Sequence, residues 1–293
     1  MKVVLFCGGQ DLRMRGAAGD GVPKPMVPLG GRPLLWHVMR YYAHWGYKDF
    51  ILCLGHGGET IKEYFVGREA WRSNDFVVGP GGTGPEILRD DMRDWRVTLV
   101  DTGAEANIGE RLLAVRPHLR GERIFLANYS DGLTDYPLPH LVEDVVDRGA
   151  VGGFLATRPP TSFHFVEHDA DGVVRAMRSA EETPLRVNGG FFVFHRDIFD
   201  HIRPGEELVE APFARLAEKR LLLAHRYDGF WRCCDTPKDV RALEGMLARG
   251  PGPWELWRRF PPGDGPAARD WLGSQLQFQL QLRPAAEPET LDG

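Results

Sequence analysis

The sequence has few cysteines, no long apolar run and no excess of positive charge. Its four cysteines form no Cys-x-x-Cys pair and two of them, Cys233 and Cys234, are adjacent, so neither a disulfide framework nor a zinc site is expected. No apolar run approaches the roughly 20 residues that a membrane-spanning helix needs. The 36 Lys and Arg residues are outnumbered by 41 Asp and Glu, and the resulting net charge of −5 argues against non-specific binding of nucleic acid.

The sequence also begins without a recognisable signal peptide, because it enters the apolar run Val3–Phe6 almost at once. We therefore expect a cytoplasmic protein. Its 293 residues are enough to bury one large core or two modest ones, and 43% hydrophobic residues is ordinary for a globular protein.

Strand and helix patterns alternate along the first 130 residues. Short apolar runs predict strands, and apolar residues at helical spacing predict the helices between them. The predicted strands are 3–6, 49–54, 95–101 and 123–127, and the helices are 35–45, 59–66 and 108–115. This alternation predicts an α/β fold: a three-layer, Rossmann-like, mostly parallel sheet with helices on both faces. Residues 70–94, which include a Gly- and Pro-rich stretch, are expected to break this alternation. The segments 163–166 and 173–177 predict a small antiparallel β addition, and the later segments predict a Phe-rich strand at 187–194 and a helix at about 196–202.

The first strand is followed by features that suit an anionic ligand. Gly8 and Gly9 end the strand, and Arg13 and Lys24 come next, with Lys24 held between two prolines. A Gly-rich loop after a strand places backbone N–H groups at the carboxyl edge of the sheet, where phosphates bind. The segment 128–132 follows the strand 123–127, so it places Asp131 at the same edge.

Five motifs then occur in the order seen in sugar-1-phosphate nucleotidylyltransferases, which the chain resembles over roughly residues 1–258. They are Gly8-Gly9 with Arg13, Pro23-Lys24-Pro25-Met26-Val27, Tyr129-Ser130-Asp131-Gly132, Asn188-Gly189-Gly190-Phe191, and Trp231 with Asp235-Thr236. The phrases at 34–39, 61–65 and 95–103 are typical of the glucose-1-phosphate cytidylyltransferase branch, to which the chain is most similar.

The resemblance implies a catalytic domain over residues 1–258, mainly nucleotide-binding in 1–135 and mainly sugar-binding in 136–258. Residues 259–293, rich in Pro, Gly and Ala, are expected to form a poorly ordered tail. The family's enzymes transfer a nucleotidyl group, which implies a Mg²⁺-dependent reaction in nucleotide-sugar biosynthesis. CTP is the favoured nucleotide, and glucose-1-phosphate is the default acceptor. The reaction releases pyrophosphate and forms an NDP-sugar. The implied partners are the nucleoside triphosphate, the sugar phosphate and further copies of the chain in a homo-oligomer, with no nucleic acid or membrane.

The resemblance also implies a role for each motif residue. Catalysis is assigned to Arg13, Lys24, Asp131 and Asp235, of which Asp131 and Asp235 would hold the Mg²⁺. Nucleotide binding is assigned to Gly8, Gly9, Asp11, Leu12, Arg13, Lys24 and Arg111, and family analogy allows Arg111 to come from a neighbouring subunit. Sugar binding is assigned to Tyr129, Asn188, Gly189 and Trp231.

Two departures from the family pattern leave other interpretations open. Asp11 and Leu12 replace a glycine and a threonine of the phosphate loop, and a carboxylate there repels a triphosphate. The family's Glu-Lys-Pro, whose lysine grips the sugar phosphate, is also absent. A catalytically impaired homologue that binds nucleotide or sugar phosphate as a regulatory or scaffolding subunit is therefore the alternative. A glycosyltransferase is a weaker third reading, because no Asp-x-Asp ends the strand 123–127. Taken singly, Asp235 could instead be a helix cap, and His37 is expected to be a packing or surface residue rather than a metal ligand.

Overall fold

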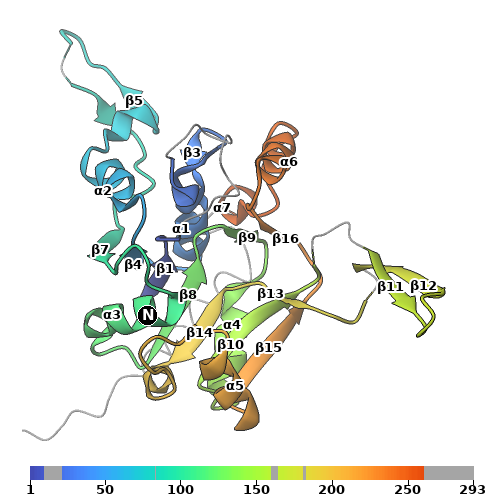
Figure 1. Ribbon diagram of the computed structural model, residues 1–293. Helices are drawn as coiled ribbons and strands as arrows, with labels where there is room; N and C mark the ends of the chain where they lie inside the picture. The colour runs from blue at the N-terminus through green and yellow to red at the C-terminus, as the bar shows by residue number, and fades with distance from the viewer. Residues whose placement is uncertain (10–21, 83, 160–163, 181–182, 261–293) are drawn as a thin grey trace, which may run out of the picture.

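The computed structural model describes residues 1–9, 22–82, 84–159, 164–180 and 183–260 (Figure 1). Its main feature is an eight-stranded sheet in the order β13-β10-β14-β8-β1-β4-β7, with β15 paired to β10. The strands are β1 (Val3–Phe6), β4 (Asp49–Leu54), β7 (Arg96–Asp101), β8 (Ile124–Tyr129), β10 (Gly152–Thr157), β13 (Val187–Asn188), β14 (Phe192–His195) and β15 (Leu222–Tyr227).

The first half of the chain forms the parallel part of this sheet. β1 lies between β4 and β8 and is parallel to both, with Val3 level with Phe50 on one side and Leu126 on the other. β7 continues the parallel order beyond β4. The helices between these strands are α1 (Leu34–His44), α2 (Gly58–Val66) and α3 (Ile108–Val115). The predicted α/β fold with a mostly parallel sheet is confirmed.

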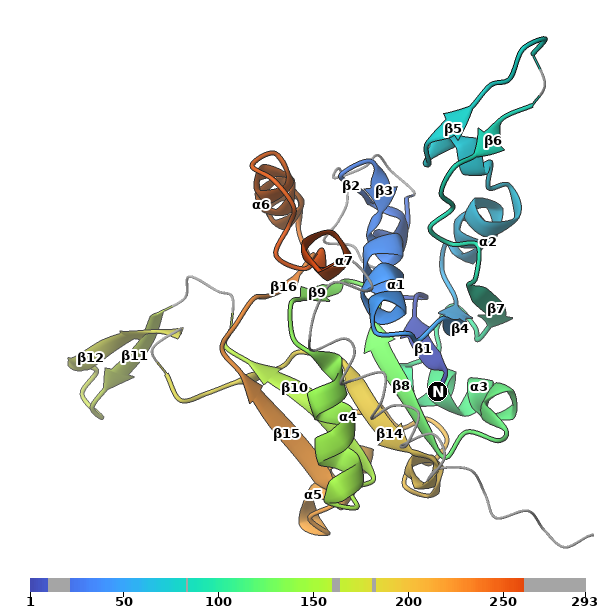
Figure 2. The same ribbon diagram turned by 180° about the vertical axis from the view of Figure 1, so that it is seen from behind.

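Alternate residues of β1 face two separate cores, as expected for a sheet covered on both sides. Val3 and Leu5 belong to one core, which also contains the apolar residues of α1 and of α4 (Leu138–Asp147). Val4 and Phe6 belong to the other, which contains residues of α3 and α5 (Ala211–Glu218). Figure 2 shows α1 and α4 in front of the sheet.

The second half of the chain adds antiparallel pairs to the sheet. β14 is antiparallel to both β8 and β10, while β10 and β15 are parallel. The predicted strand at 187–194 is interrupted, because Gly190 and Phe191 both have positive φ, 74° and 55°. The segment predicted as a helix at 196–202 forms the 3-10 helix η6 (Arg196–Asp200) instead. Another 3-10 helix, η4 (Arg116–Leu119), lies in the first half of the chain, after α3.

Two hairpins project from this body. One joins β5 (Phe76–Val77) to β6 (Glu86–Ile87), in the region that was expected to break the regular alternation. The other joins β11 (His164–His168) to β12 (Val174–Ser179) and is the predicted antiparallel addition (Figures 1 and 2). None of the helices in the described part of the chain has both the length and the apolar character needed to cross a bilayer.

The last described helices pack against α1 and the small ribbon that precedes it. β2 (Pro28–Leu29) and β3 (Arg32–Pro33) form a small ribbon next to the 3-10 helix η2 (Lys24–Met26). β9 (Gly132–Thr134) pairs with β16 (Trp231–Cys233), and α6 (Pro237–Leu247) and α7 (Leu256–Arg259) follow. In α7, Trp257 packs edge-on against Trp36 of α1, with ring centroids 5.6 Å apart.

Candidate active site

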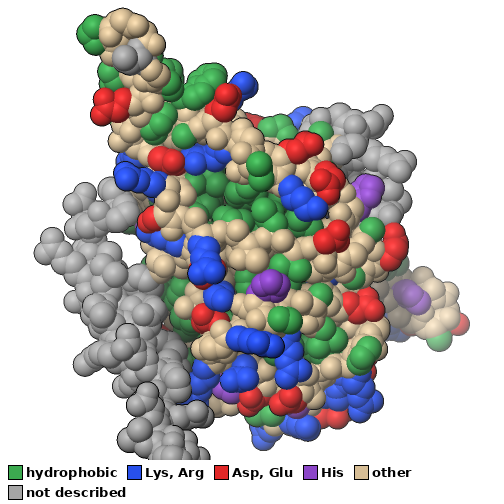
Figure 3. Space-filling model, turned by 90° about the vertical axis from the view of Figure 1, so that its left-hand side faces the viewer, with side chains coloured by type: hydrophobic (Ala, Val, Ile, Leu, Met, Phe, Trp, Pro, Cys, Tyr) green, Lys and Arg blue, Asp and Glu red, His purple; other side chains and the backbone are tan. Residues whose placement is uncertain are grey.

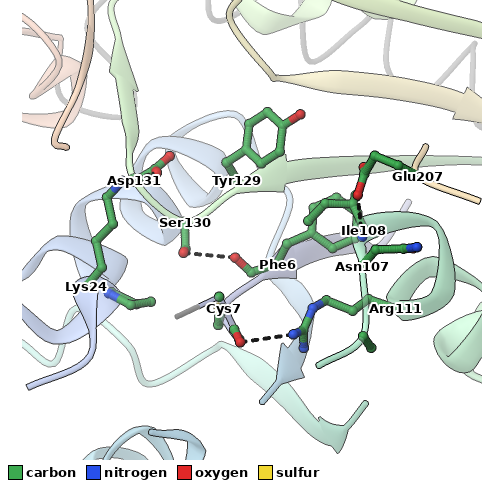
Figure 4. Close-up of a pocket in the computed structure, with 14 residues that line it drawn as sticks. Phe6, Cys7, Lys24, Asn107, Ile108, Arg111, Tyr129, Ser130, Asp131 and Glu207 are labelled. Atoms are coloured by element: carbon green, nitrogen blue, oxygen red, sulfur yellow. Dashed lines mark hydrogen bonds and ion pairs between the residues drawn. The ribbon is translucent and has the colours of Figure 1, made fainter. Parts of the chain in front are cut away.

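A cavity of about 450 Å³ opens at the carboxyl ends of β1 and β8. This is the edge of a parallel sheet at which α/β proteins bind their ligands. Figure 4 shows Lys24 and Asp131 at one end of the cavity and Glu207 with Asn107 at the other. The residues that line it are Phe6, Cys7, Gly8, Gly9, Lys24, Pro25, Ala106, Asn107, Ile108, Arg111, Tyr129, Ser130, Asp131 and Glu207.

Lys24, Asp131 and Asp235 meet at the first of these ends. The Lys24 Nζ lies 2.6 Å from an Asp131 carboxylate oxygen and is also ion-paired with Asp235. The lysine side chain is only 9% exposed, against 19% for Asp131 and 32% for Asp235. Three charged groups far apart in the sequence therefore form one cluster, and the two carboxylates are brought together as the sequence predicted.

Local pairing explains why Asp131 and Asp235 converge. β9 begins directly after Asp131, and β16 ends two residues before Asp235. These strands are antiparallel neighbours, with Gly132 level with Cys233, and the Cys234 N–H donates to the Asp131 carbonyl at 3.0 Å. The two-strand pairing thus fixes the carboxylates side by side.

Asp235 is not the cap of the following helix. The cap of α6 is Thr236, whose side chain accepts from the Asp239 N–H, while the Asp239 carboxylate accepts from the Thr236 N–H. Asp239 also accepts the Asp235 N–H at 3.2 Å. The reciprocal cap holds the Asp235 backbone and leaves its carboxylate to interact with Lys24.

Lys24 keeps its positive charge in this cluster. Burial by itself lowers the pKa of Lys24, but the negative charge of Asp131 and the hydrogen bonds to both aspartates outweigh it, so the pKa is raised above its usual value. Lys24 is therefore an ammonium at neutral pH. Burial, together with the charge of Asp131, raises the pKa of the neighbouring Cys233 thiol, which stays protonated.

The donor atoms fit a divalent cation of the magnesium type. Ligand atoms of Asp131, Cys233 and Asp235 lie within 4.8 Å of one another. Two carboxylates are the oxygen ligands that Mg²⁺ prefers, whereas a neutral thiol is a poor ligand for it. The ammonium of Lys24 already stands beside both carboxylates, which indicates that the position favours a cation.

The Gly-rich turn after β1 is shaped by Arg111. This arginine is 2% exposed, and its guanidinium donates to the carbonyls of Gly8, Leu54 and Ala104 and to the Thr102 hydroxyl. A Cβ on Gly8 would lie 2.2 Å from an Arg111 nitrogen, so glycine is required there. Arg111 thus ties together the ends of β1, β4 and β7 within one chain, and its contact with nucleotide stays a prediction.

The four residues assigned to the sugar also lie together. The Asn188 amide donates to the Tyr129 hydroxyl at 3.4 Å, and the Trp231 indole donates to the Gly189 carbonyl at 2.8 Å. Burial raises the pKa of Tyr129, and the nearby charges of Glu207 and Asp131 add to this effect. Asp11, Leu12 and Arg13 lie outside the described residues.

Among the residues that line the cavity, two with polar or charged side chains, Asn107 and Glu207, were not identified by the sequence analysis. The Glu207 carboxylate accepts the Ile108 N–H at 3.2 Å, and the Asn107 side chain caps α3 by accepting the Glu110 N–H at 2.9 Å. Asn107 and Glu110 have the spacing of a capping box, which signals a helix start but not a ligand site. Nothing in the sequence around Glu207 indicates that it lies in this cavity, because about a hundred residues separate it from α3 along the chain.

No protein-family model matches the chain. Individual proteins do. The chain is 35% identical over 264 residues to the glucose-1-phosphate cytidylyltransferase of Salmonella typhi, covering 88% of this chain and 100% of that protein. The enzyme of the same name from Salmonella typhimurium gives the same identity and coverage. The mannose-1-phosphate guanyltransferase 2 of Candida glabrata is 24% identical over 272 residues, covering 89% of this chain and 67% of its own.

Solved structures agree on the fold. The structure of HddC from Yersinia pseudotuberculosis complexed with GMP-PN superposes with a TM-score of 0.58 at 16% identity. The matched region covers 84% of this chain and 99% of that one.

Proposed function

Because the chain belongs to the sugar-1-phosphate nucleotidylyltransferase family, and most resembles its glucose-1-phosphate cytidylyltransferases, we propose that it transfers a cytidylyl group from CTP to glucose-1-phosphate. An oxygen of the sugar phosphate attacks the α-phosphorus of CTP. The bond to the bridging oxygen breaks, and pyrophosphate leaves. The proposal includes Mg²⁺, held by Asp131 and Asp235. The observation that carries it is the meeting of Lys24 with these two aspartates at one end of the cavity.

The residues of the chain have separable tasks in this reaction. The substrates are both polyanions, so positive charge must hold them together and in line. Lys24 moves its ammonium from the carboxylates to the α-phosphate, where negative charge grows in the transition state. When bound, Mg²⁺ would supply a second positive charge to the phosphate oxygens. Asp131 and Asp235 have no general-base task, because a sugar phosphate is already ionised at neutral pH.

Main-chain groups complete the phosphate site. Gly8 and Gly9 turn at the end of β1 and leave room for a phosphate to approach the backbone. Arg111 donates to the carbonyl of Gly8 and so holds the N–H of Gly9, which belongs to the same peptide group. Of the residues assigned to the sugar, Tyr129 lines the cavity, and the Asn188 amide donates to its hydroxyl.

A pyrophosphate-release assay tests the proposal. CTP, UTP, dTTP, ATP and GTP are each paired with glucose-1-phosphate in the presence and absence of Mg²⁺. The expected result is turnover that requires Mg²⁺ and is fastest with CTP. Asp131→Asn and Asp235→Asn should each abolish it, whereas Asp94→Asn, in an exposed ion pair with Lys48, should not.

Two outcomes would contradict it. Full activity of both aspartate variants would show that the metal assignment is wrong. Saturable nucleotide binding with no turnover for any pair would favour the impaired, regulatory or scaffolding homologue instead.

A further inference from the structure

A second cavity lies at the other end of β8 from the candidate active site. It has a volume of about 260 Å³ and is bounded by η4, the start of β8 and η6. Phe125 borders this cavity and Tyr129 borders the first one, so four residues, roughly 13 Å of strand, separate them. Residues of the proposed transfer site do not line it. We call it the arginine cavity.

The floor of the arginine cavity is apolar and rigid. Leu119, Phe125 and Phe199 are between 0% and 7% exposed. The rings of Phe125 and Phe199 are stacked, with centroids 5.8 Å apart and planes at 17°. This aromatic pair is buried in the core beside α3 and β14, so the floor is a fixed base beneath the rim and leaves no open ring face.

The rim of the arginine cavity carries three guanidinium groups, those of Arg116, Arg120 and Arg196. The Arg116 group lies 5.2 Å above the Phe199 ring, a cation–π contact that holds it at the mouth of the cavity. Figure 3 shows Lys and Arg side chains gathered on the lower part of the face that carries α3.

These cations lack acidic partners in the part of the chain that the structure describes. Glu122 also lines the cavity, but its carboxylate lies 3.5 Å from the amino group of Met1. Asp197, next to Arg196, is 3.1 Å from the His195 ring instead. The two other bases nearby are likewise not neutralised by acids: the Lys2 ammonium donates to the His118 carbonyl and Arg123 donates to His195.

Three guanidinium groups around one hollow repel each other, and an anion at the centre removes this cost. A guanidinium group can donate two parallel hydrogen bonds to phosphate oxygens, which an ammonium group cannot do with the same geometry. These hydrogen bonds are strong because both partners are charged. The protein as a whole has a net charge of −5, so this local excess of positive charge does not follow from its overall composition.

We propose that the arginine cavity is a second ligand site, which binds a small phosphorylated molecule through its phosphate on the arginine rim. Nucleoside phosphates and pyrophosphate both carry this group. The proposal does not rest on the transfer reaction, since the two cavities share no residue.

Calorimetric titration with CMP, pyrophosphate and inorganic phosphate tests it. The double variant Arg116→Ser/Arg196→Ser is compared with Arg148→Ser, which changes an exposed arginine at the C-cap of α4 that pairs with Asp144. Wild type and the Arg148→Ser control should bind CMP at two sites. The double variant should lose one site, or weaken it at least about tenfold, as expected when two charge-assisted hydrogen bonds are removed.

The other probes separate the sources of the phosphate. Arginine-dependent binding of CMP, pyrophosphate or inorganic phosphate supports the site, and the probe that binds there most tightly identifies the source of the phosphate. Identical isotherms for the double variant and the control overturn the site itself, as does binding of an RNA oligonucleotide without any small phosphate. Unchanged melting temperatures establish that the variants are folded.

Discussion

Replacement of Lys24 by methionine isolates the charge that the cluster depends on. The Lys24→Met side chain is similar in length and keeps the apolar stem, but it leaves Asp131 and Asp235 facing each other without the ammonium. Their oxygen atoms lie within 4.8 Å. At an effective dielectric constant of about 20, two charges at that distance repel by about 3.5 kcal/mol. Because the carboxylates are 19% and 32% exposed, solvent screens part of this.

We expect the free energy of unfolding of Lys24→Met to fall by about 2 kcal/mol at pH 7 without divalent metal, which corresponds to a drop in Tm of about 4 °C for a chain of this size. A metal ion that occupies the carboxylates would replace the missing charge. Adding Mg²⁺ or Mn²⁺ should therefore raise the Tm of Lys24→Met more than that of wild type, whose own ammonium competes for the same oxygens.

Thermal denaturation with and without metal measures both effects, and Lys48→Met is the matched control. Lys48 pairs with Asp94, and both are at least 40% exposed, so this loss should change stability by less than about 0.5 kcal/mol. If Lys24→Met melts like Lys48→Met, the buried-cluster reasoning is wrong. If it is destabilised but gains nothing extra from metal, the cluster is correct and the metal assignment fails. Turnover of Lys24→Met should fall more than its nucleotide affinity, because the charge acts mainly in the transition state.

Three further predictions concern other parts of the molecule. Burial lowers the pKa of His37 from 6.5 to about 4, and its neutral ring accepts the Trp254 indole N–H at 3.1 Å. The wild-type protein should therefore lose up to about 3 kcal/mol of stability as the pH falls from 6.5 towards 4, and His37→Gln should show a shallower loss in thermal melts at acid pH. Gly109→Ala would place a Cβ 2.1 Å from the main-chain oxygen of Glu206 and should lower the free energy of unfolding by about 1–3 kcal/mol. Gly245→Ala, on α6 with open space around it, should raise it slightly, and urea unfolding that ranks the two variants the other way contradicts this packing. Asp11→Gly should tighten triphosphate binding by on the order of 1 kcal/mol, and unchanged affinity by titration would mean that the carboxylate faces away from the phosphates.

The sequence determined the elements of the parallel half with little error. Apolar runs such as Val3–Phe6 and Asp49–Leu54 are strands because both faces of the sheet are covered, and this makes the whole run apolar rather than alternating. Prediction from the sequence failed where the local pattern of residues differs from the way the strands pair in the fold. The Phe-rich run at 187–194 has strand composition, yet its glycines admit the positive φ that splits it into β13 and β14. The segment after His195 has helical spacing but forms only 3-10 turns.

The sequence by itself also determined which side chains of the described chain were candidates for the site, since order and motif pointed to Lys24, Asp131 and Asp235. Only the tertiary structure decided that they touch. Their separation in the chain exceeds a hundred residues, and the distance between them is set by the pairing of β9 with β16, which no local pattern records.

The same limit explains what the sequence analysis missed. Glu207 reaches the active-site cavity because its loop packs on the start of α3, and the arginine cavity exists because η4 and η6 meet beside the first residues of β8. In the sequence, Glu207 and the arginines of this cavity have the character of ordinary surface residues. Charge and shape become specific only when the fold brings such residues together, because electrostatic and packing energies depend on distances in space and not on positions along the chain.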